Sequence, residues 1–252
     1  MLKYFYLLKD VCLINPGLLV KAVFWGILLG WAGWNFFLKR PFYQRLYGVP
    51  TDKKLEIWEA DIFTELPKQK IIPLRINGYN IEIQAIKSFK TVSRVVYVDR
   101  YSPLGTWYRS LEGTRLYDKI VPQDISLASG VAGRDSSCIK FTHEYRMLVP
   151  EPTKKRCSQE FDEHYRNDVS NNHSIAASPN VQRGLDILKE GDIAEIEGYA
   201  VYWNGTGDLR YIRFESAITL GQISKQIAGG MHGILCRQLL ITKITFDGYT
   251  FE

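Results

Sequence analysis

The chain has 252 residues, a formal net charge of +5 and a sequence pI of about 8.9. A chain this long can bury a substantial core without staples, and four cysteines are too few for the disulfide framework of a small secreted domain. Because no two cysteines are spaced as C-x-x-C, zinc-knuckle and thioredoxin-type sites are excluded. One pairing stays open, between Cys138 and Cys157 in an oxidising compartment.

The first predicted element is a membrane anchor over residues 18–38, bounded by Leu18 and Leu38. This run holds one charge, Lys21, and one amide, Asn35. As a helix it would be roughly 30 Å long, the thickness of the hydrocarbon core of a bilayer. A cleavable signal peptide has a shorter apolar core and small residues at its cleavage site, so an anchor is favoured. Residues 1–40 therefore form the first predicted part of the chain, a flank followed by a transmembrane helix.

Two further features of this part bear on its surroundings. Gly26 and Gly30 have the four-residue spacing of glycines that let membrane helices pack closely, although such pairs also arise by chance. Lys and Arg are more frequent after the span than before it, which favours a cytoplasmic location for the body. The opposite orientation stays open, because Lys21 lies at the other end of the span.

A connector over residues 41–70 is predicted next, with a short amphipathic helix that uses Leu55, Trp58 and Ile62. The β-rich soluble domain is predicted over residues 71–252. It starts with strands at 71–76 and 81–89 around an Asn-Gly turn, and the second strand alternates apolar and polar residues. Residues 95–98 continue as a strand. Residues 101–174 have no regular pattern, and so long an insert is where we expect a functional site.

The remainder of the chain has clear signals. Ser178 and Pro179 are a suitable N-cap and first residue of a helix that ends before Gly191. A strand with a bulge at Gly198 is predicted over 193–203, a partner strand over 209–219, and a closing strand over 235–246. These elements predict a mainly β fold with one or two helices, arranged as a partly open antiparallel barrel with a long irregular insert.

The segment GDIAEIEGYAVYW, residues 191–203, resembles the Gly-Asp strand start that is often seen in OB-type barrels. The resemblance implies an OB-like barrel. SH3-like and sandwich arrangements stay open.

The candidate catalytic residues are His173, Asn172, His143 and Asp124. His173 and His143 could act as an acid–base pair, with Asp124 or Asp168 orienting one imidazole. Asn172 could donate a hydrogen bond to a developing oxyanion. In the structural alternative, polar residues at 170–173 bond the backbone of a turn before the helix, and His173 is a packed, hydrogen-bonded side chain.

No metal site or cofactor is predicted, and an enzymatic activity is not favoured. Glu160, Glu163 and His164 lack the H-E-x-x-H spacing of zinc proteases, so a charged surface explains them better. Residues 129–134 contain two glycines but no Gly-Lys-Ser/Thr, which excludes a P-loop. No G-x-S-x-G nucleophile motif occurs.

Three segments, Pro-Gln-Asp-Ile-Ser-Leu-Ala (122–128), Phe-Thr-His (141–143) and Ser-Asn-Asn-His (170–173), resemble those of uncharacterised bacterial single-span membrane proteins. The resemblance implies a shared fold and a bacterial inner-membrane location, without an activity. We therefore expect a membrane-anchored binding or scaffold protein, with the lipid bilayer and either a protein partner or a second copy as its partners.

Two other functions stay open. One is a membrane-tethered hydrolase that uses His173 and His143. The other is binding of single-stranded nucleic acid through an OB-like barrel. Phe89 and Lys90 point to opposite faces of their strand, so base stacking and phosphate contact would not share a surface, which disfavours nucleic acid without excluding it.

Overall fold

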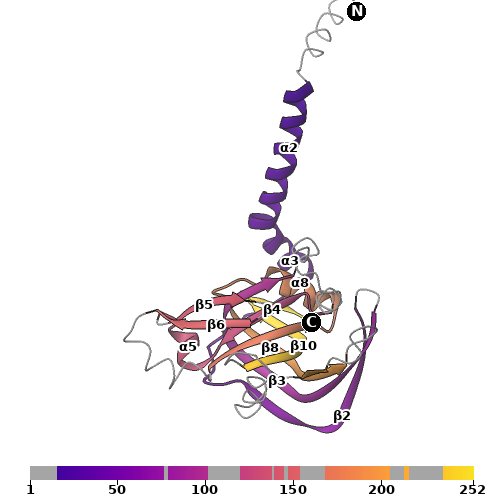
Figure 1. Ribbon diagram of the computed structural model, residues 1–252, viewed down its shortest axis with the longest axis vertical. Helices are drawn as coiled ribbons and strands as arrows, with labels where there is room; N and C mark the ends of the chain where they lie inside the picture. The colour runs from indigo at the N-terminus through magenta and orange to yellow at the C-terminus, as the bar shows by residue number, and fades with distance from the viewer. Residues whose placement is uncertain are drawn as a thin grey trace, which may run out of the picture. The chain divides into compact units, whose positions relative to one another are not determined.

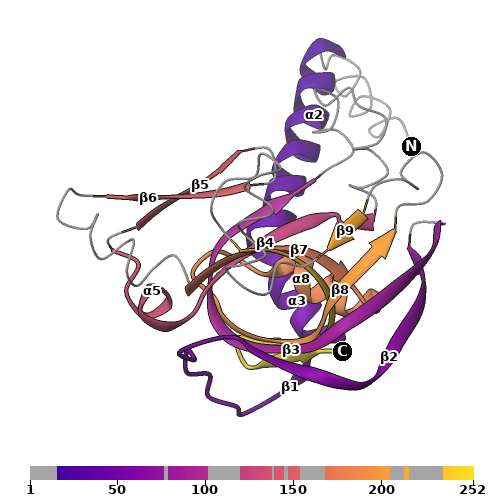
Figure 2. The same ribbon diagram turned by 60° about the horizontal axis from the view of Figure 1, so that its bottom comes forward.

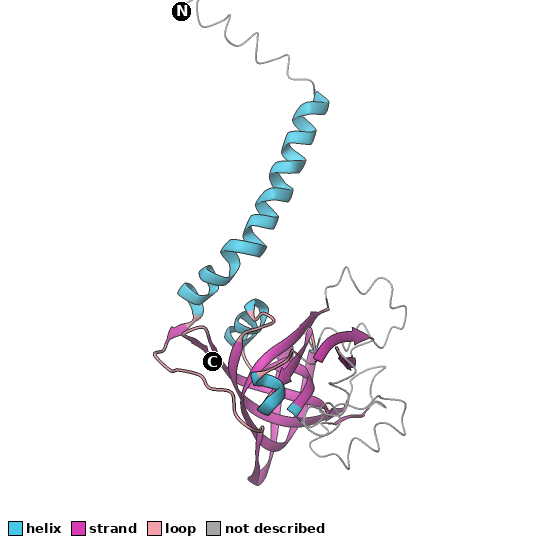
Figure 3. Cartoon of the chain, turned by 90° about the vertical axis from the view of Figure 1, so that its left-hand side faces the viewer, coloured by secondary structure: helices cyan, strands magenta, loops and turns pink. Residues whose placement is uncertain are grey.

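The computed structural model describes residues 16–76, 79–101, 120–137, 139–144, 147–153, 168–204, 213–215 and 235–252. Contacts divide the chain into two compact units, residues 1–46 and residues 47–252. The first unit is helical, and strands dominate the second (Figure 1, Figure 3).

From residue 16 on, the helical unit has three consecutive elements: α2 (Pro16–Gly33), η2 (Trp34–Leu38) and α3 (Lys39–Tyr47), whose last residue already belongs to the second unit. The single α-helix predicted over residues 18–38 is wrong in its last turn, because η2 is a π-helix. The side chain of Asn35 donates to the carbonyl of Trp31 at 2.9 Å, the carbonyl that an α-helix would pair with the backbone N–H of Asn35. This competition favours the wider turn.

Across the described residues, no helix combines the length and the apolar character needed to cross a membrane, so the span predicted at residues 18–38 is not found.

Large apolar side chains are nonetheless exposed along these helices. Thirteen of the seventeen exposed large apolar residues in the described part of the chain lie between residues 20 and 46. At 100° per residue, Trp25 and Leu29 project from the side opposite Val20 and Ile27. We call residues 20–46 the apolar helical segment.

The second unit contains a nine-stranded mixed sheet. Its strands are β1 (Val49–Pro50), β2 (Ile62–Ile76), β3 (Tyr79–Arg100), β4 (Gln123–Ala128), β7 (Val169–Ala176), β8 (Ile193–Asn204), β9 (Arg213–Glu215), β10 (Leu235–Phe246) and β11 (Tyr249–Phe251). A separate two-stranded sheet is formed by β5 (Ile139–Glu144) and β6 (Met147–Pro152). The described residues of this unit also form the helices α5 (Gly130–Arg134) and α8 (Pro179–Ile187).

Five strands close into a ring, in the order β3, β4, β7, β10, β8 and back to β3 (Figure 2). Four of these pairings are antiparallel, but β7 and β10 run parallel. The mainly β prediction is therefore confirmed, and the purely antiparallel one is wrong. The chain runs through α8 and β8 between β7 and β10, and this crossover returns it in the same direction.

β2 begins inside the connector that we expected to be partly helical. It pairs with β3 from Ile62 to Ile76, and the ring of Phe63 lies 5.2 Å from that of Phe89. This pairing with a strand outside the connector outweighs the helical spacing of a few apolar residues.

Residues 101–174 were predicted to be irregular, and this prediction is wrong for β4, β5, β6 and β7. β4 and β7 even lie in the ring, and β7 consists of Val-Ser-Asn-Asn-His-Ser-Ile-Ala. All but the last residue of β7 are buried, so neither face shows the alternation of apolar and polar residues by which a strand is recognised. The turn that we considered for residues 170–173 is wrong for the same reason.

The signals at the end of the chain are confirmed. Ser178 caps α8 by accepting a hydrogen bond from the N–H of Val181 at 3.1 Å, and β8 and β10 lie where they were predicted. The bulge predicted at Gly198 of β8 lies instead on the neighbouring strand β10, at Thr242. Gly198 itself permits a close approach, since a Cβ there would lie 2.1 Å from the carbonyl oxygen of Leu240. Of the predicted strand 209–219, only β9 lies within the described residues.

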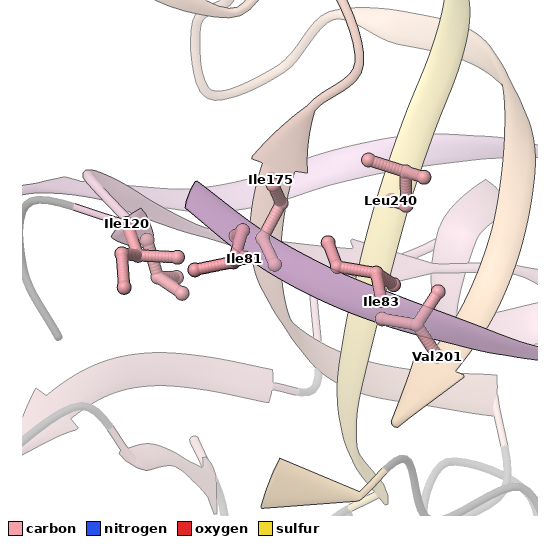
Figure 4. Close-up of a cluster of buried hydrophobic side chains, with 7 residues drawn as sticks. Ile81, Ile83, Ile120, Ile175, Val201 and Leu240 are labelled. Atoms are coloured by element: carbon pink, nitrogen blue, oxygen red, sulfur yellow. The ribbon is translucent and has the colours of Figure 1, made fainter. Parts of the chain in front are cut away.

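One buried apolar cluster joins four strands of the ring. Ile81 and Ile83 of β3 meet Ile175 of β7, Val201 of β8 and Leu240 of β10 (Figure 4). Such contacts between strands that are distant in sequence stabilise the ring as a single unit.

A buried carboxylate ties the segment before β2 to the sheet. Glu195 of β8 is 2% exposed and accepts hydrogen bonds from the Lys53 ammonium at 2.6 and 2.7 Å. Lys90 of β3 lies 3.1 Å from Glu195 and 2.9 Å from Glu197. Burial acts to raise the pKa of Glu195, but hydrogen bonds from Lys53 and Lys90 outweigh it and lower the pKa below its ordinary value of 4.5.

We predict that Glu195→Gln destabilises the protein at neutral pH and has less effect in acid. A carboxyl whose pKa is lowered by folding stabilises the protein above its unfolded pKa, and this stability is lost as the pH falls through the lower, folded value. Losing hydrogen bonds to a charged group costs about 2 kcal/mol. Unfolding of the full chain in detergent, followed by circular dichroism, should show a difference that shrinks as the pH falls below about 4.5.

Glu190→Gln, at an exposed carboxylate after α8, is the matched control and should leave the pH profile unchanged. A constant difference between wild type and Glu195→Gln at every pH would contradict the assigned role of these ion pairs.

Candidate functional site

The candidate site lies where β4 and β7 run side by side in the ring. Asp124 and His173 are directly opposite each other in the register. Nδ1 of His173 lies 2.8 Å from Oδ1 of Asp124, and the hydroxyl of Tyr101 donates to Oδ2 of Asp124 at 2.8 Å. Both members of this carboxylate–imidazole pair are buried, with Asp124 1% and His173 6% exposed.

The position of the proton between the two groups depends on their ionisation. If Asp124 is ionised, its carboxylate can only accept, and the proton then resides on Nδ1 of His173. Nε2 is then the ring atom that accepts a hydrogen bond or exchanges a proton. The orientation of an imidazole by a carboxylate is the arrangement used in general acid–base catalysis, and it also stabilises a buried histidine without any reaction.

Other polar side chains on the same face continue the site. Gln238 of β10 is opposite His173 in the parallel register and is 6% exposed. One step along the other two strands, the hydroxyl of Ser126 donates to Oδ1 of Asn171 at 3.3 Å. We did not predict Tyr101, Ser126, Asn171 or Gln238 as site residues. Their proximity depends on strand register, and the only signal in the sequence was the place of Gln238 in the alternation of residues 235–246.

Asn172 does not belong to this site. Successive residues of a strand point to opposite faces, so Asn172 faces away from His173. Its amide nitrogen donates to the carbonyl of Ile125 at 3.0 Å and to the hydroxyl of Ser170 at 3.1 Å. The oxyanion role that we considered for Asn172 beside His173 is therefore wrong.

The face of Asn172 has its own buried polar group, Arg237 of β10, which is opposite Asn172 in the register. Arg237 is 3% exposed, forms an ion pair with Asp61, and its guanidinium carbon lies 5.0 Å from the ring centre of Phe63. Nε of Arg237 and Oδ1 of Asn172 are buried and have no hydrogen-bond partner among the described residues.

The predicted partnership of His143 with His173 is not shown. His143 belongs to β5, which pairs only with β6 in the described part of the chain. In this pairing His143 is opposite Leu148. The side chain of His143, together with residues 138 and 154–167, lies outside what the structure describes. The predicted pairing of Cys138 with Cys157 is therefore also outside the described residues.

Asp168, the other carboxylate considered for orienting an imidazole, has a different contact. Its Oδ2 accepts a hydrogen bond from the backbone N–H of Val131 at 2.9 Å, at the start of α5. Burial raises the pKa of Asp168, against the effect of the backbone hydrogen bonds from Ala132 and Val131. Between the two candidates, the carboxylate that contacts His173 is that of Asp124.

Two further residues clarify what this unit can bind. Phe89, considered for base stacking, is 2% exposed and packs on Phe63, so it belongs to the core. No group of three or more potential metal ligands occurs among the residues that the structure describes.

Comparison with protein-family models, curated proteins and solved structures finds no match for this chain.

The buried pair predicts energetic coupling between its two members. We expect a double-mutant cycle of Asp124→Asn and His173→Gln to give a coupling energy of about 1–3 kcal/mol, because the charge-assisted bond exists only when both residues are present. The coupling energy is measured by unfolding the full chain in detergent for wild type, both single variants and the double variant.

The pair of Ser126 and Asn171 on the same two strands is the matched control. It is neutral and longer, so the cycle of Ser126→Ala and Asn171→Ala should give a coupling of about 0.5 kcal/mol. A coupling between Asp124 and His173 no larger than this control would contradict the proton arrangement given above.

Proposed function

We propose that this chain is a membrane-anchored binding or scaffold protein, held at a bilayer by the apolar helical segment. The observation that carries the proposal is the exposure of thirteen large apolar side chains between residues 20 and 46. Exposed apolar surface of this extent is typical of a region that contacts lipid or another protein. A helix that is apolar on every side indicates lipid, since a groove on a partner would cover one face.

The aromatic and basic residues of the segment support lipid as the main contact. Trp25, Trp31 and Trp34 have exposed fractions of 56%, 64% and 38%, and tryptophan is enriched where a bilayer meets water. Lys39, Arg40 and Arg45 lie in the last eight residues of the segment, an excess of positive charge that favours the cytoplasmic side. The proposal is therefore a protein of the bacterial inner membrane whose body lies in the cytoplasm. It requires anchoring in lipid and does not depend on a crossing.

For the body, we propose an OB-type arrangement. Support comes from a ring of five strands in which the first pairs with the second and the fourth, and the third runs parallel to the fifth. OB-type domains bind ligands on the face of their second and third strands. In this chain those strands are β4 and β7, which hold the buried residues Asp124 and His173.

The anchor is tested by substituting exposed apolar residues. We predict that the full chain, expressed in a bacterium, stays with the membrane fraction after alkaline extraction, and that a variant with Ile27→Gln, Leu29→Gln and Trp31→Gln does not. Burying three such side chains contributes roughly 5 kcal/mol, so their loss weakens partition more than about a thousand-fold.

The matched control removes three exposed apolar side chains from the body, with Val49→Gln, Ile62→Gln and Ile71→Gln. This variant should stay with the membrane. Release of the wild-type chain by alkali, or a water-soluble dimer formed through the apolar helical segment, would overturn anchoring. For the assembly, the detergent-solubilised chain should cross-link in cells to itself or to a defined protein, and an isolated monomer without cross-links would overturn the binding role.

A second candidate is a membrane-tethered hydrolase, favoured by the contact of His173 with Asp124 at 2.8 Å. In this mechanism His173 would act as the general base toward a water molecule, and Asp124 would be its positioning residue. His143 is not needed for the geometry that supports this candidate.

We predict that, if the chain is a hydrolase, its turnover of chromogenic carboxylic and phosphoric esters falls about a hundred-fold or more in His173→Gln, the size of a lost general base. The pH profile should change in Asp124→Asn, while Glu190→Gln, at the exposed carboxylate after α8, serves as the control with unchanged turnover. If wild type hydrolyses no ester of the panel faster than the buffer does, the hydrolase is excluded for these substrate classes.

A further inference from the structure

We propose that α3 is an interfacial helix that recognises the headgroups of anionic phospholipids. This inference rests on the proposed membrane anchoring and adds the lipid class that the anchor prefers. Phospholipid headgroups and free phosphate are both phosphate-bearing anions. We propose that the anion bound by α3 belongs to phospholipids at the bilayer surface.

The charge of the three described helices, α2, η2 and α3, has one sign. Residues 16–47 contain four cations, Lys21, Lys39, Arg40 and Arg45, and no aspartate or glutamate. Three of the four lie within seven residues of each other on α3. A surface of negative charge is therefore the complement of α3.

The arrangement of residues around α3 fits a helix that lies in the plane of a membrane surface. At 100° per residue, Phe42, Leu46 and Tyr43 share one face, and Lys39 lies among them. Arg45 lies on one flank of this face and Arg40 on the other. Phe42 is 44% and Leu46 57% exposed. Long basic side chains on and beside an apolar face place the rings below the headgroups and extend their charges to them.

Contacts within the unit hold this face together. The ring of Phe42 packs edge-on against Trp34 of η2, with centroids 5.2 Å apart. The ammonium of Lys39 lies 5.5 Å from the ring centre of Tyr43. The first contact makes the apolar face of α3 continuous with that of η2. The second keeps the Lys39 charge beside the aromatic rings, at the depth where phosphates lie.

The experiment measures partition of the full chain, diluted from detergent, into vesicles of two compositions. One is phosphatidylcholine alone, and the other contains about one third phosphatidylglycerol. Each basic residue at an anionic surface contributes about 1 kcal/mol, so three residues predict a preference of roughly 100-fold for the anionic vesicles. The variant with Lys39→Gln, Arg40→Gln and Arg45→Gln should lose this preference and keep its partition into phosphatidylcholine.

The control variant removes the same charge from exposed positions of the body, with Lys68→Gln, Lys140→Gln and Lys189→Gln, and should keep the preference. Equal partition of wild type into both kinds of vesicle, or an equal loss in the control variant, would overturn the inference and leave the anchoring intact. Failure to enter either vesicle would overturn both. Loss of the preference when inorganic phosphate replaces chloride at equal ionic strength would show a site for free phosphate, against the bilayer surface.

Discussion

One strand, β3, constrains the whole second unit. Its 22 residues pair with β8 along one edge and with β2 and then β4 along the other. No straight strand could satisfy these partners, and the registers shift between Ala85 and Lys87 and again between Val95 and Tyr97. Such irregularities increase local twist and bend a strand. The closure of the ring, and with it the opposition of Asp124 and His173, depends on this bending.

Helices and strands could be predicted where their sequence signals are local, and could not where they depend on residues distant in the chain. α8 was predictable because its signals are local: Ser178 caps it and Pro179 opens it. β8 and β10 were predictable because one face of each is more apolar than the other. β7 was not, because its polar side chains are buried and form hydrogen bonds within the sheet. Ser170 and Asn172 bond each other, while Asn171 meets Ser126 and His173 meets Asp124 on the neighbouring β4. A strand whose polar side chains are buried and hydrogen-bonded shows no alternation of apolar and polar residues in its sequence.

The candidate site shows the same division. Pairing a carboxylate with a histidine is a statement about chemistry, and residue types suffice to suggest Asp124 and His173. Whether Asn172 joins them is a statement about geometry. In a turn three consecutive polar residues can converge, whereas in a strand the middle one points away. The error over Asn172 therefore follows directly from the error over β7. The pairing of β10 with β7, which adds Gln238 to the site, spans more than sixty residues of sequence, and no local signal encodes such a register.

The two units also differ in how many large apolar side chains they expose. In the described part of the body, even charged residues such as Glu195 and Arg237 are buried with partners, and only Val49, Ile62, Ile71 and Val131 are large apolar residues with high exposure. This is an ordinary surface for a protein in water. The apolar helical segment has thirteen such residues on fewer than thirty positions. The described body has a core that buries most of its large apolar residues, so the exposed residues of the segment call for a separate explanation. This contrast within one chain supports the proposal that the segment contacts a bilayer.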